Sequence, residues 1–372
     1  MINNIQALRA LAAISVAIYH TGYNIFGIHT DFYGVAVFFV ISGFIMCHIS
    51  MRDGRENDPE IFILHRIVRI VPLYWFCIFL LIGYSNLGLL NILRTLPHIF
   101  NQSIENPLYL LGWMSQIVSF NYYSLSEIFK SLFFIPYINR HGDIQPLLGV
   151  GWTLNMEMAF YLIFAFCLGV FKSKAPWYSA LMILIIWFIC GNKLFHDSPV
   201  RLYSNTYMIH FVIGILVYMI YKKIKTIEFL YYKTILSAFF GILFIGFFII
   251  QLYPSPPLIY SIPYIFLIAP GILVLSSLFL EVIGVRIQNK TVLLLGAASY
   301  SIYLTHTIVL EFLRPIGDIY PFLAFRSTLS GFLVSLFLMI FVGLLVHFFV
   351  EKPMLNYLRC KIKNRNNLAI SS

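Results

Sequence analysis

Long apolar runs, separated by short polar or basic segments, occupy almost the whole chain of 372 residues. A run of about 20 apolar residues is what a helix needs to cross the hydrocarbon core of a bilayer. Helices are expected because an open sheet would leave backbone polar groups unpaired in lipid. The pattern predicts about ten transmembrane helices, at residues 5–26, 32–50, 71–90, 152–171, 177–195, 205–221, 234–253, 262–280, 292–312 and 328–350.

The composition agrees with an all-α integral membrane protein. Hydrophobic residues make up 60% of the chain and charged residues 11%, against about 25% charged residues in soluble domains. The net charge of +10 does not indicate a nucleic-acid partner, because most lysines and arginines fall in the segments on one side of the predicted helices. Such a bias marks the cytoplasmic side and predicts that both termini are inside. The five cysteines are scattered without metal-ligand spacing, so we expect no metal.

Two connecting segments stand out from the short loops. The segment 91–151 is long, lies outside in the predicted topology and contains SEIFKSLFFIPY, an amphipathic stretch expected to lie as a helix in the membrane interface. The inner segment 51–70 leads into HRIVRIVPLYW, where Arg66 and Arg69 are about one helical turn apart and share a face. This pair is either the ordinary basic flank of a membrane helix or a phosphate-binding pair at the inner surface.

The first predicted helix carries two ionisable residues in an apolar run, Arg9 and His20. Eleven steps of about 100° bring both side chains to one face, about 16 Å apart along the axis. An ionisable group inside a membrane costs a few kcal/mol and usually faces a polar interior or a partner. The two residues are therefore either anchors that reach opposite surfaces of the bilayer or parts of a buried functional path.

Two later helices carry ionisable residues at a similar distance from their predicted outer ends. Glu157 follows Trp152, which we place at the outer interface. His306 ends a stripe that begins with Ser299 and Tyr303, at helical spacings of four and three residues.

The counting puts His20, Glu157 and His306 at a common depth of about 9 Å. The sequence thus predicts an inner basic site and an outer His/Glu site, where a carboxylate orients a histidine as general base. For His210 and His347, a structural hydrogen bond is the expected role.

The order of these motifs resembles the membrane-bound acyltransferase family 3, and the resemblance covers nearly the whole chain. Arg9 and His20 resemble the Arg-x10-His signature of that family. The later matches are FFVISGFIM with Ser42 and Gly43, RIVRIVPLYW with Pro72, WTLNMEMAFY with Thr153 and Glu157, SYSIYLTH, and Glu351-Lys352-Pro353. The chain departs from many members at Ala36, where an acidic residue is common; Asp31 is the nearest acid that could substitute for it.

The resemblance implies an O-acyltransferase that takes an acyl group, most often acetyl, from cytoplasmic acetyl-CoA. The acceptor is a hydroxyl of an exopolysaccharide, an O-antigen or another lipid-linked glycan, and the enzyme is a multi-pass protein of the bacterial inner membrane. We expect residues 1–352 to form the transmembrane acyltransferase domain and residues 353–372 a basic cytoplasmic tail. Some members carry a further C-terminal esterase-like domain, whereas this chain ends soon after the last predicted helix.

On this basis we assign three predicted roles within the membrane domain. His20, Glu157 and His306 are the candidate catalytic residues, and Arg9, Arg66 and Arg69 are the candidate acyl-CoA ligands. The candidate acceptor-binding residues are Trp152, Ser299 and Tyr303. The acyl group either reaches His20 on an extended pantetheine arm or passes through a covalent intermediate.

Other functions remain compatible with part of this pattern. The same enzyme could use another donor, such as succinyl-CoA. A transporter of glycans or small molecules would also carry buried ionisable residues, although the internal repeats common in transporters are not visible here. A non-catalytic membrane scaffold would leave the buried charges unexplained. Consumption of acetyl-CoA separates the enzyme from the other two classes.

Overall fold

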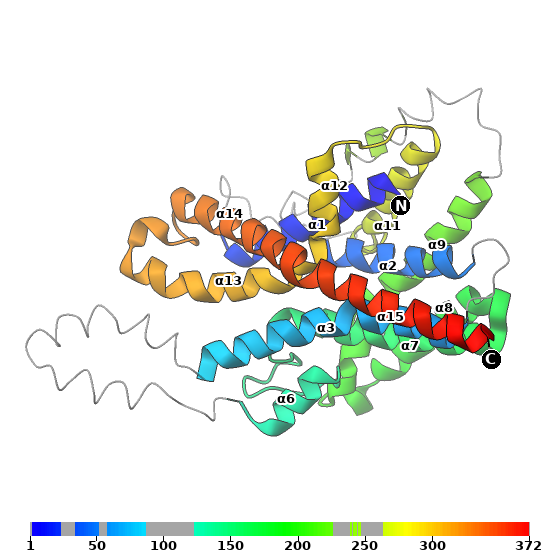
Figure 1. Cartoon of the computed structure of the whole chain (residues 1–372), viewed down its shortest axis with the longest axis horizontal. Coiled ribbons are helices and arrows are strands. Elements are labelled where there is room, and N and C mark those ends of the chain that lie inside the picture. The colour runs from blue at the N-terminus through cyan, green and yellow to red at the C-terminus, as the bar shows by residue number, and fades with distance from the viewer. Residues whose placement is uncertain are drawn as a thin grey trace, which may run out of the picture.

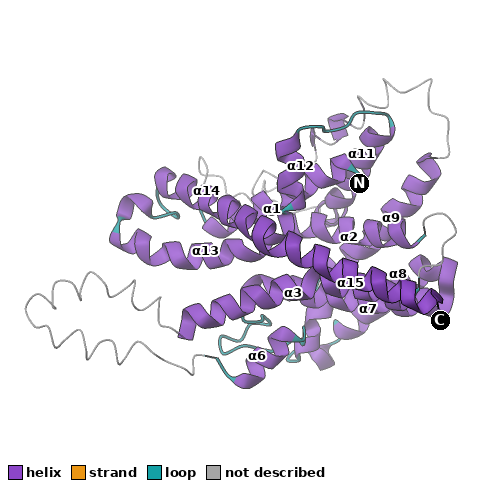
Figure 2. Ribbon diagram, viewed as in Figure 1, coloured by secondary structure: helices purple, strands orange, loops and turns teal. Residues whose placement is uncertain are grey.

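The computed structural model describes residues 2–23, 34–51, 58–86, 123–225 and 263–371, together with 239, 241–243 and 245–246. Within these residues every regular element is a helix, as Figure 2 shows. The all-helical prediction is therefore confirmed for the described part of the chain. The predicted span 234–253 and the first half of the segment 91–151 lie almost wholly outside the described residues, as does Asp31.

Helix α1 (Asn3–Thr21) packs mainly against four other helices: α2 (Gly34–Ser50), α11 (Pro263–Val282), α12 (Lys290–Ala297) and α13 (Ser299–Ile319). A carboxylate from α11 holds its first turn, because Glu281 accepts hydrogen bonds from the backbone N–H groups of Asn3, at 3.0 Å, and Asn4, at 2.7 Å. Asn4 also donates to the carbonyl of Val285 at 2.8 Å. These contacts satisfy backbone donors that a helix start leaves unpaired and fix the position of α1.

Helix α2 packs most extensively against α9 (Tyr207–Lys225). Glycines permit this close approach. A Cβ on Gly43 would lie 2.3 Å from the carbonyl oxygen of Phe211, and a Cβ on Gly214 would lie 2.2 Å from that of Val40. Small residues at such crossings let helix backbones come together, as in many membrane helix pairs.

The other side of the bundle is formed by α3 (Pro59–Asn86), α7 (Trp152–Phe171) and α8 (Ala175–Cys190). Helix α14 (Leu329–Val346) packs along α13 and continues through a π-helical turn, His347–Glu351, into α15 (Lys352–Ser371). In Figure 1 this run forms one long rod, orange to red, across the face of the bundle. Glu351 in the π turn accepts hydrogen bonds from His347 and from Ser301 of α13, each at 2.7 Å. The hydrogen bond of His347 lies within its own helical run, so the expected bond from this histidine to another helix is not seen among the described residues; Glu351 makes the link to α13.

Three helical stretches in the described part are long and apolar enough to cross a membrane: Pro59–Ser85, Gly149–Cys190 and Leu329–Ile362. The number is four if α12 and α13 count as one broken span, since they meet at a bend of 68°. The predicted continuous helix at 292–312 is therefore wrong, because the chain breaks at Ala298. The total of ten spans and the orientation of the termini stay predictions.

The amphipathic stretch predicted in the segment 91–151 forms α6 (Leu125–Leu132). Ser124 and Glu127 cap its start reciprocally, as in a capping box. Leu125 and Phe129 are exposed on its outer face, whereas its end is tied to α3 by the indole N–H of Trp75, which donates to the carbonyl of Leu132. The helix is confirmed, and its place in a membrane interface stays a prediction.

Candidate active site

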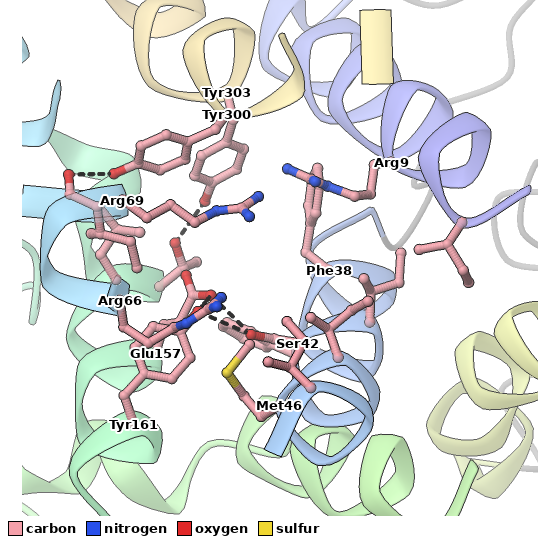
Figure 3. A pocket seen from close by; sticks show the side chains of 18 of the residues that line it. Arg9, Phe38, Ser42, Met46, Arg66, Arg69, Glu157, Tyr161, Tyr300 and Tyr303 are labelled. Carbon is pink, nitrogen blue, oxygen red and sulfur yellow. Dashed lines mark hydrogen bonds between the residues drawn. The ribbon is translucent and has the colours of Figure 1, made fainter. Parts of the chain in front are cut away.

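A cavity of about 380 Å³ lies between five helices: α1, α2, α3, α7 and α13. Arg9 enters it from α1, and Arg66 and Arg69 enter from α3 on the opposite side. Figure 3 shows the three guanidinium groups pointing toward the space between these helices. The helical spacing of Arg66 and Arg69 places both on the face of α3 that looks into the cavity. The predicted grouping of the three arginines is thus present in the structure.

Glu157 on α7 lines the same cavity and is the carboxylate among its lining residues. Its Oε1 accepts hydrogen bonds from the hydroxyl of Ser42, at 2.9 Å, and from the hydroxyl of Tyr161. Among the described residues no carboxylate forms an ion pair with Arg9, Arg66 or Arg69. Three cations against one carboxylate leave the cavity with a positive excess, and such an excess favours an anionic ligand.

Two polar atoms on the cavity residues are buried without a hydrogen-bond partner in the described part of the chain. They are Nε of Arg66 and Nε2 of Gln6. A buried donor without a partner costs about 1–3 kcal/mol, so native proteins rarely keep one unless a ligand or water completes the site. Both donors are suited to oxygen atoms of an anion, which agrees with the positive excess.

A pair of histidines forms a second cluster at the other end of α1. His20 Nδ1 lies 2.8 Å from the carbonyl oxygen of Val16 and 3.3 Å from Nε2 of His306. His306 Nδ1 lies 3.3 Å from the carbonyl oxygen of Ile302. His306 is completely buried, whereas His20 is exposed. The exposed ring is therefore backed by a buried one.

The hydrogen bonds of this pair determine where the protons are. A carbonyl oxygen only accepts, so Nδ1 of His20 carries a hydrogen for Val16, and Nδ1 of His306 carries one for Ile302. In the neutral rings Nε2 of His306 is then an acceptor facing the Nδ1–H of His20. The remaining nitrogen, Nε2 of His20, keeps its lone pair free for a substrate proton.

Tyr303 stands between the cavity and the histidine pair. Its side chain lines the cavity, its ring centroid is 5.9 Å from that of His306, and its hydroxyl is 2.8 Å from the hydroxyl of Thr153. Thr153 donates to the carbonyl of Val150, which lies 3.3 Å from the Tyr303 hydroxyl. The ring is thus held in place from α7, and neither His20 nor His306 lines the cavity.

The structure changes the predicted position of Glu157. It lies with Ser42, Tyr161 and the arginine cavity rather than in contact with His20 or His306, and its depth in the membrane stays a prediction. The counting assumed that α7 begins at the outer surface. Its first residue instead follows a buried segment that includes Leu148, Val150 and Gly151, so the start of α7 already lies inside the protein.

Two of the predicted acceptor-binding residues lie outside the cavity. Trp152 is half-buried and packs against Tyr207, with ring centroids 5.5 Å apart. Ser299 is fully buried at the break between α12 and α13. Tyr303 is the predicted acceptor-binding residue that reaches the cavity.

Several residues that line the cavity were not among the predicted site residues: Gln6, Phe38, Ser42, Tyr161 and Tyr300. Helical spacing could have identified two of them. Gln6 precedes Arg9 by three residues and Tyr161 follows Glu157 by four, so each shares a face with a predicted site residue. Ser42 belongs to one of the matched motifs, but no pattern along the chain indicates that it meets Glu157 from another helix.

Comparisons with known proteins agree on one class. The acyltransferase 3 family model, described as an acyltransferase domain, matches residues 2–348. The exopolysaccharide production protein ExoZ of Rhizobium meliloti is 31% identical over 333 residues, which cover 87% of this chain and 89% of ExoZ. The O-acetyltransferase OatA of Staphylococcus aureus is 25% identical over 83% of this chain. The putative peptidoglycan O-acetyltransferase YrhL of Bacillus subtilis is 26% identical over 55% of it.

The chain differs in extent from two of these relatives. The matched region covers 51% of OatA and 31% of YrhL. Among solved structures no match was found.

Proposed function

Because the chain belongs to the acyltransferase 3 family and is an O-acyltransferase, we propose that it acetylates a hydroxyl of a surface polysaccharide in the bacterial inner membrane, as a multi-pass protein. The proposed donor is cytoplasmic acetyl-CoA. The proposed acceptor is a lipid-linked or exported glycan, such as an exopolysaccharide or O-antigen. The observation that carries the proposal is the cavity with three arginines and one carboxylate.

The arginine cavity fits the anionic part of an acyl-CoA. Phosphate oxygens accept well from guanidinium groups, and Arg66 and Gln6, which each carry a buried donor without a partner in the described part of the chain, both line the cavity. The cavity also has an apolar wall, which includes Ile5, Ile41 and Ile45 and suits an extended thiol arm. In the predicted topology the ends of α1 and α2 that carry Ile2 and Ile49 face the cytoplasm, where acyl-CoA is available.

His20 is the proposed general base. Its free Nε2 takes the proton from the acceptor hydroxyl as the hydroxyl oxygen attacks the thioester carbon. The new C–O ester bond forms, the C–S bond breaks, and the proton passes from His20 to the leaving thiolate, which departs as CoA thiol. His306 supports the charged form of His20, since its Nε2 accepts from the Nδ1–H of His20.

Glu157 takes a different role from the one that counting along the helices suggested. It lies among the arginines and binds Ser42 and Tyr161. We assign to it the balancing of buried positive charge and the positioning of these two hydroxyl groups. Burying like-charged groups together without a counter-charge is costly, so one carboxylate lowers the cost of holding three arginines in the empty cavity.

The relatives support a glycan acceptor without defining the sugar. ExoZ is named for exopolysaccharide production, and YrhL for putative peptidoglycan O-acetylation. His20 is exposed near the end of α1 that lies away from the arginine cavity. In the predicted topology this end faces the outer side, where an exported polysaccharide is present.

The test compares surface glycan from cells that express the wild type, His20→Ala, His141→Ala or an empty vector. His141 lies in an exposed loop and controls for loss of a histidine as such. We expect one acetyl mass per modified sugar from the wild type and His141→Ala, and none from His20→Ala at equal membrane abundance. An added succinyl mass would assign succinyl-CoA as donor instead. Normal acetylation by His20→Ala would refute the assigned base.

A further inference from the structure

We infer that Phe38 and Tyr303 form a constriction that limits the size of the acyl group this enzyme transfers. The inference rests on the proposed function, because it assumes a donor in the arginine cavity and an acceptor at His20. Figure 3 shows Phe38 of α2 and the tyrosines of α13 on two sides of the cavity.

The constriction is defined by contacts on both of its sides. The rings of Phe38 and Tyr303 meet edge to face, with centroids 5.8 Å apart, and both residues line the cavity. Beyond Tyr303 lies His306, with ring centroids 5.9 Å apart, and His306 is in turn 3.3 Å from His20. The cavity lining therefore includes Tyr303 but not the histidine pair, which lies on the other side of the Tyr303 ring.

Tyr303 is the fixed half of the constriction and Phe38 the half that a substitution can open. The Tyr303 hydroxyl is held by Thr153 at 2.8 Å, and Tyr303 is buried. Phe38 has no polar atom on its side chain, and it is only half-buried. Its rotation or removal leaves no hydrogen bond unmade.

Tyr303 lies between the cavity and the histidine pair, so in the proposed reaction the acyl group passes this point on its way to His20. If the pantetheine arm extends from the arginines toward His20, the acyl group is its leading end. If the acyl group is first transferred to Nε2 of His20, the N–C bond forms as the C–S bond breaks and the CoA thiolate leaves, so the thioester end of the arm again has to pass the two rings. In both cases the carbon chain of the acyl group has to fit between Phe38 and Tyr303, so each added methylene meets a closely packed wall.

The constriction also separates the thioester from the side where His20 is exposed. If water reached the thioester, hydrolysis would break the C–S bond and join the acyl carbon to the water oxygen. The products are acetate, a proton and free CoA thiol, with no acceptor consumed. A closed aromatic pair suppresses this loss, as water exclusion does in other active sites.

The experiment measures two ratios on each membrane preparation. The first is transfer to glycan from butyryl-CoA relative to acetyl-CoA, and the second is release of free CoA without acceptor relative to transfer. One added methylene commonly changes selectivity about 10–200-fold in a close-fitting apolar pocket, so the wild type should prefer acetyl-CoA by at least about tenfold. Phe38→Ala should reduce this preference to within about threefold and increase hydrolysis severalfold.

Two further variants make the result specific. Phe166→Ala removes an exposed phenylalanine ring from α7 that lies outside the cavity, and it should keep the wild-type ratios. Phe38→Leu is a smaller change that should shift the ratios in the same direction if Phe38→Ala folds poorly. Because both donors are compared on one preparation, the ratio does not depend on the amount of folded enzyme.

The outcomes distinguish the inference from the function on which it rests. A wild type that transfers no acyl group from any acyl-CoA would refute the proposed function. A wild type that transfers acetyl, combined with unchanged ratios in both Phe38 variants, would overturn the constriction. Equal shifts in Phe166→Ala would also overturn it, because the selectivity would then not depend on this aromatic pair.

Discussion

Replacing His306 tests whether the buried histidine is a second base or a support for His20. In the structure His306 is completely buried and its Nε2 accepts from the Nδ1–H of His20 at 3.3 Å. That hydrogen is shared with the carbonyl of Val16, which is nearer, at 2.8 Å. His306→Phe removes the longer of two acceptors and keeps a ring of similar size. The tautomer of His20 is therefore retained.

The expected loss follows from the difference between neutral and charged hydrogen bonds. A bond between neutral groups contributes about 1 kcal/mol, and one to a charged group about 1.5–3 kcal/mol. His20 is neutral before proton transfer and charged during it, so loss of the His306 acceptor should raise the activation free energy by about 1 kcal/mol. This corresponds to a decrease in kcat of about five- to tenfold. Loss of a general base itself, in His20→Ala, should cost about 100- to 10,000-fold.

The assay is the initial rate of CoA release that depends on acceptor glycan, at saturating acetyl-CoA, in membranes with equal amounts of enzyme. His306→Gln should recover part of the rate, because its amide oxygen can accept in place of Nε2. KM for acetyl-CoA should stay unchanged in both variants. A decrease as large as that of His20→Ala would show that His306 moves the proton itself, and an unchanged kcat would show that it gives no support.

The remaining predictions concern the cavity and the helix packing. Arg69→Gln removes a charged ligand of the donor and should raise KM for acetyl-CoA about 10- to 100-fold in steady-state kinetics. The control Arg201→Gln changes an exposed arginine and should leave this KM unchanged. Glu281→Gln weakens the two hydrogen bonds to the first turn of α1. It should lower the free energy of unfolding by about 1 kcal/mol, seen as a lower thermal midpoint in detergent, while kcat per folded molecule is retained. Gly214→Ala places a Cβ 2.2 Å from the carbonyl oxygen of Val40, so the contact between α2 and α9 must open. The yield of folded protein on size-exclusion chromatography should fall severalfold. A normal yield would contradict the close approach of the two helices.

The arginine cavity was largely predictable from the sequence, because its parts follow helical spacing. Arg66 and Arg69 lie about one turn apart on α3 and point the same way. The position of Glu157 was not predictable in this way. Depth is counted from Trp152, but the buried residues Leu148 and Val150 precede that point. Their run PLLGVG is apolar, yet it is short and contains two glycines, so the pattern does not show whether it belongs to the span or to the segment before it.

The break at Ala298 shows a second limit of local patterns. Residues 292–312 read as one apolar helix without a proline, yet the chain bends by 68° between α12 and α13. Gly296 lies against α1 so closely that a Cβ would be 2.0 Å from the carbonyl oxygen of Gln6. The bend lets α12 cross α1 at this glycine while α13 runs beside α1. A contact between residues distant in sequence therefore determines the break.

Helix α1 connects the two halves of the proposed reaction. Arg9 lies in the cavity, and His20 lies about 16 Å farther along the same helix, paired with His306. Because Glu281 fixes the first turn of α1, the distance between donor site and base is set by a rigid element rather than by a loop. The acceptor then has no need to enter the arginine cavity, and the phosphate groups of the donor have no need to leave it. Only the end of the donor that carries the acyl group has to pass between Phe38 and Tyr303, so transfer across the protein requires the movement of the Phe38 side chain and not of whole helices.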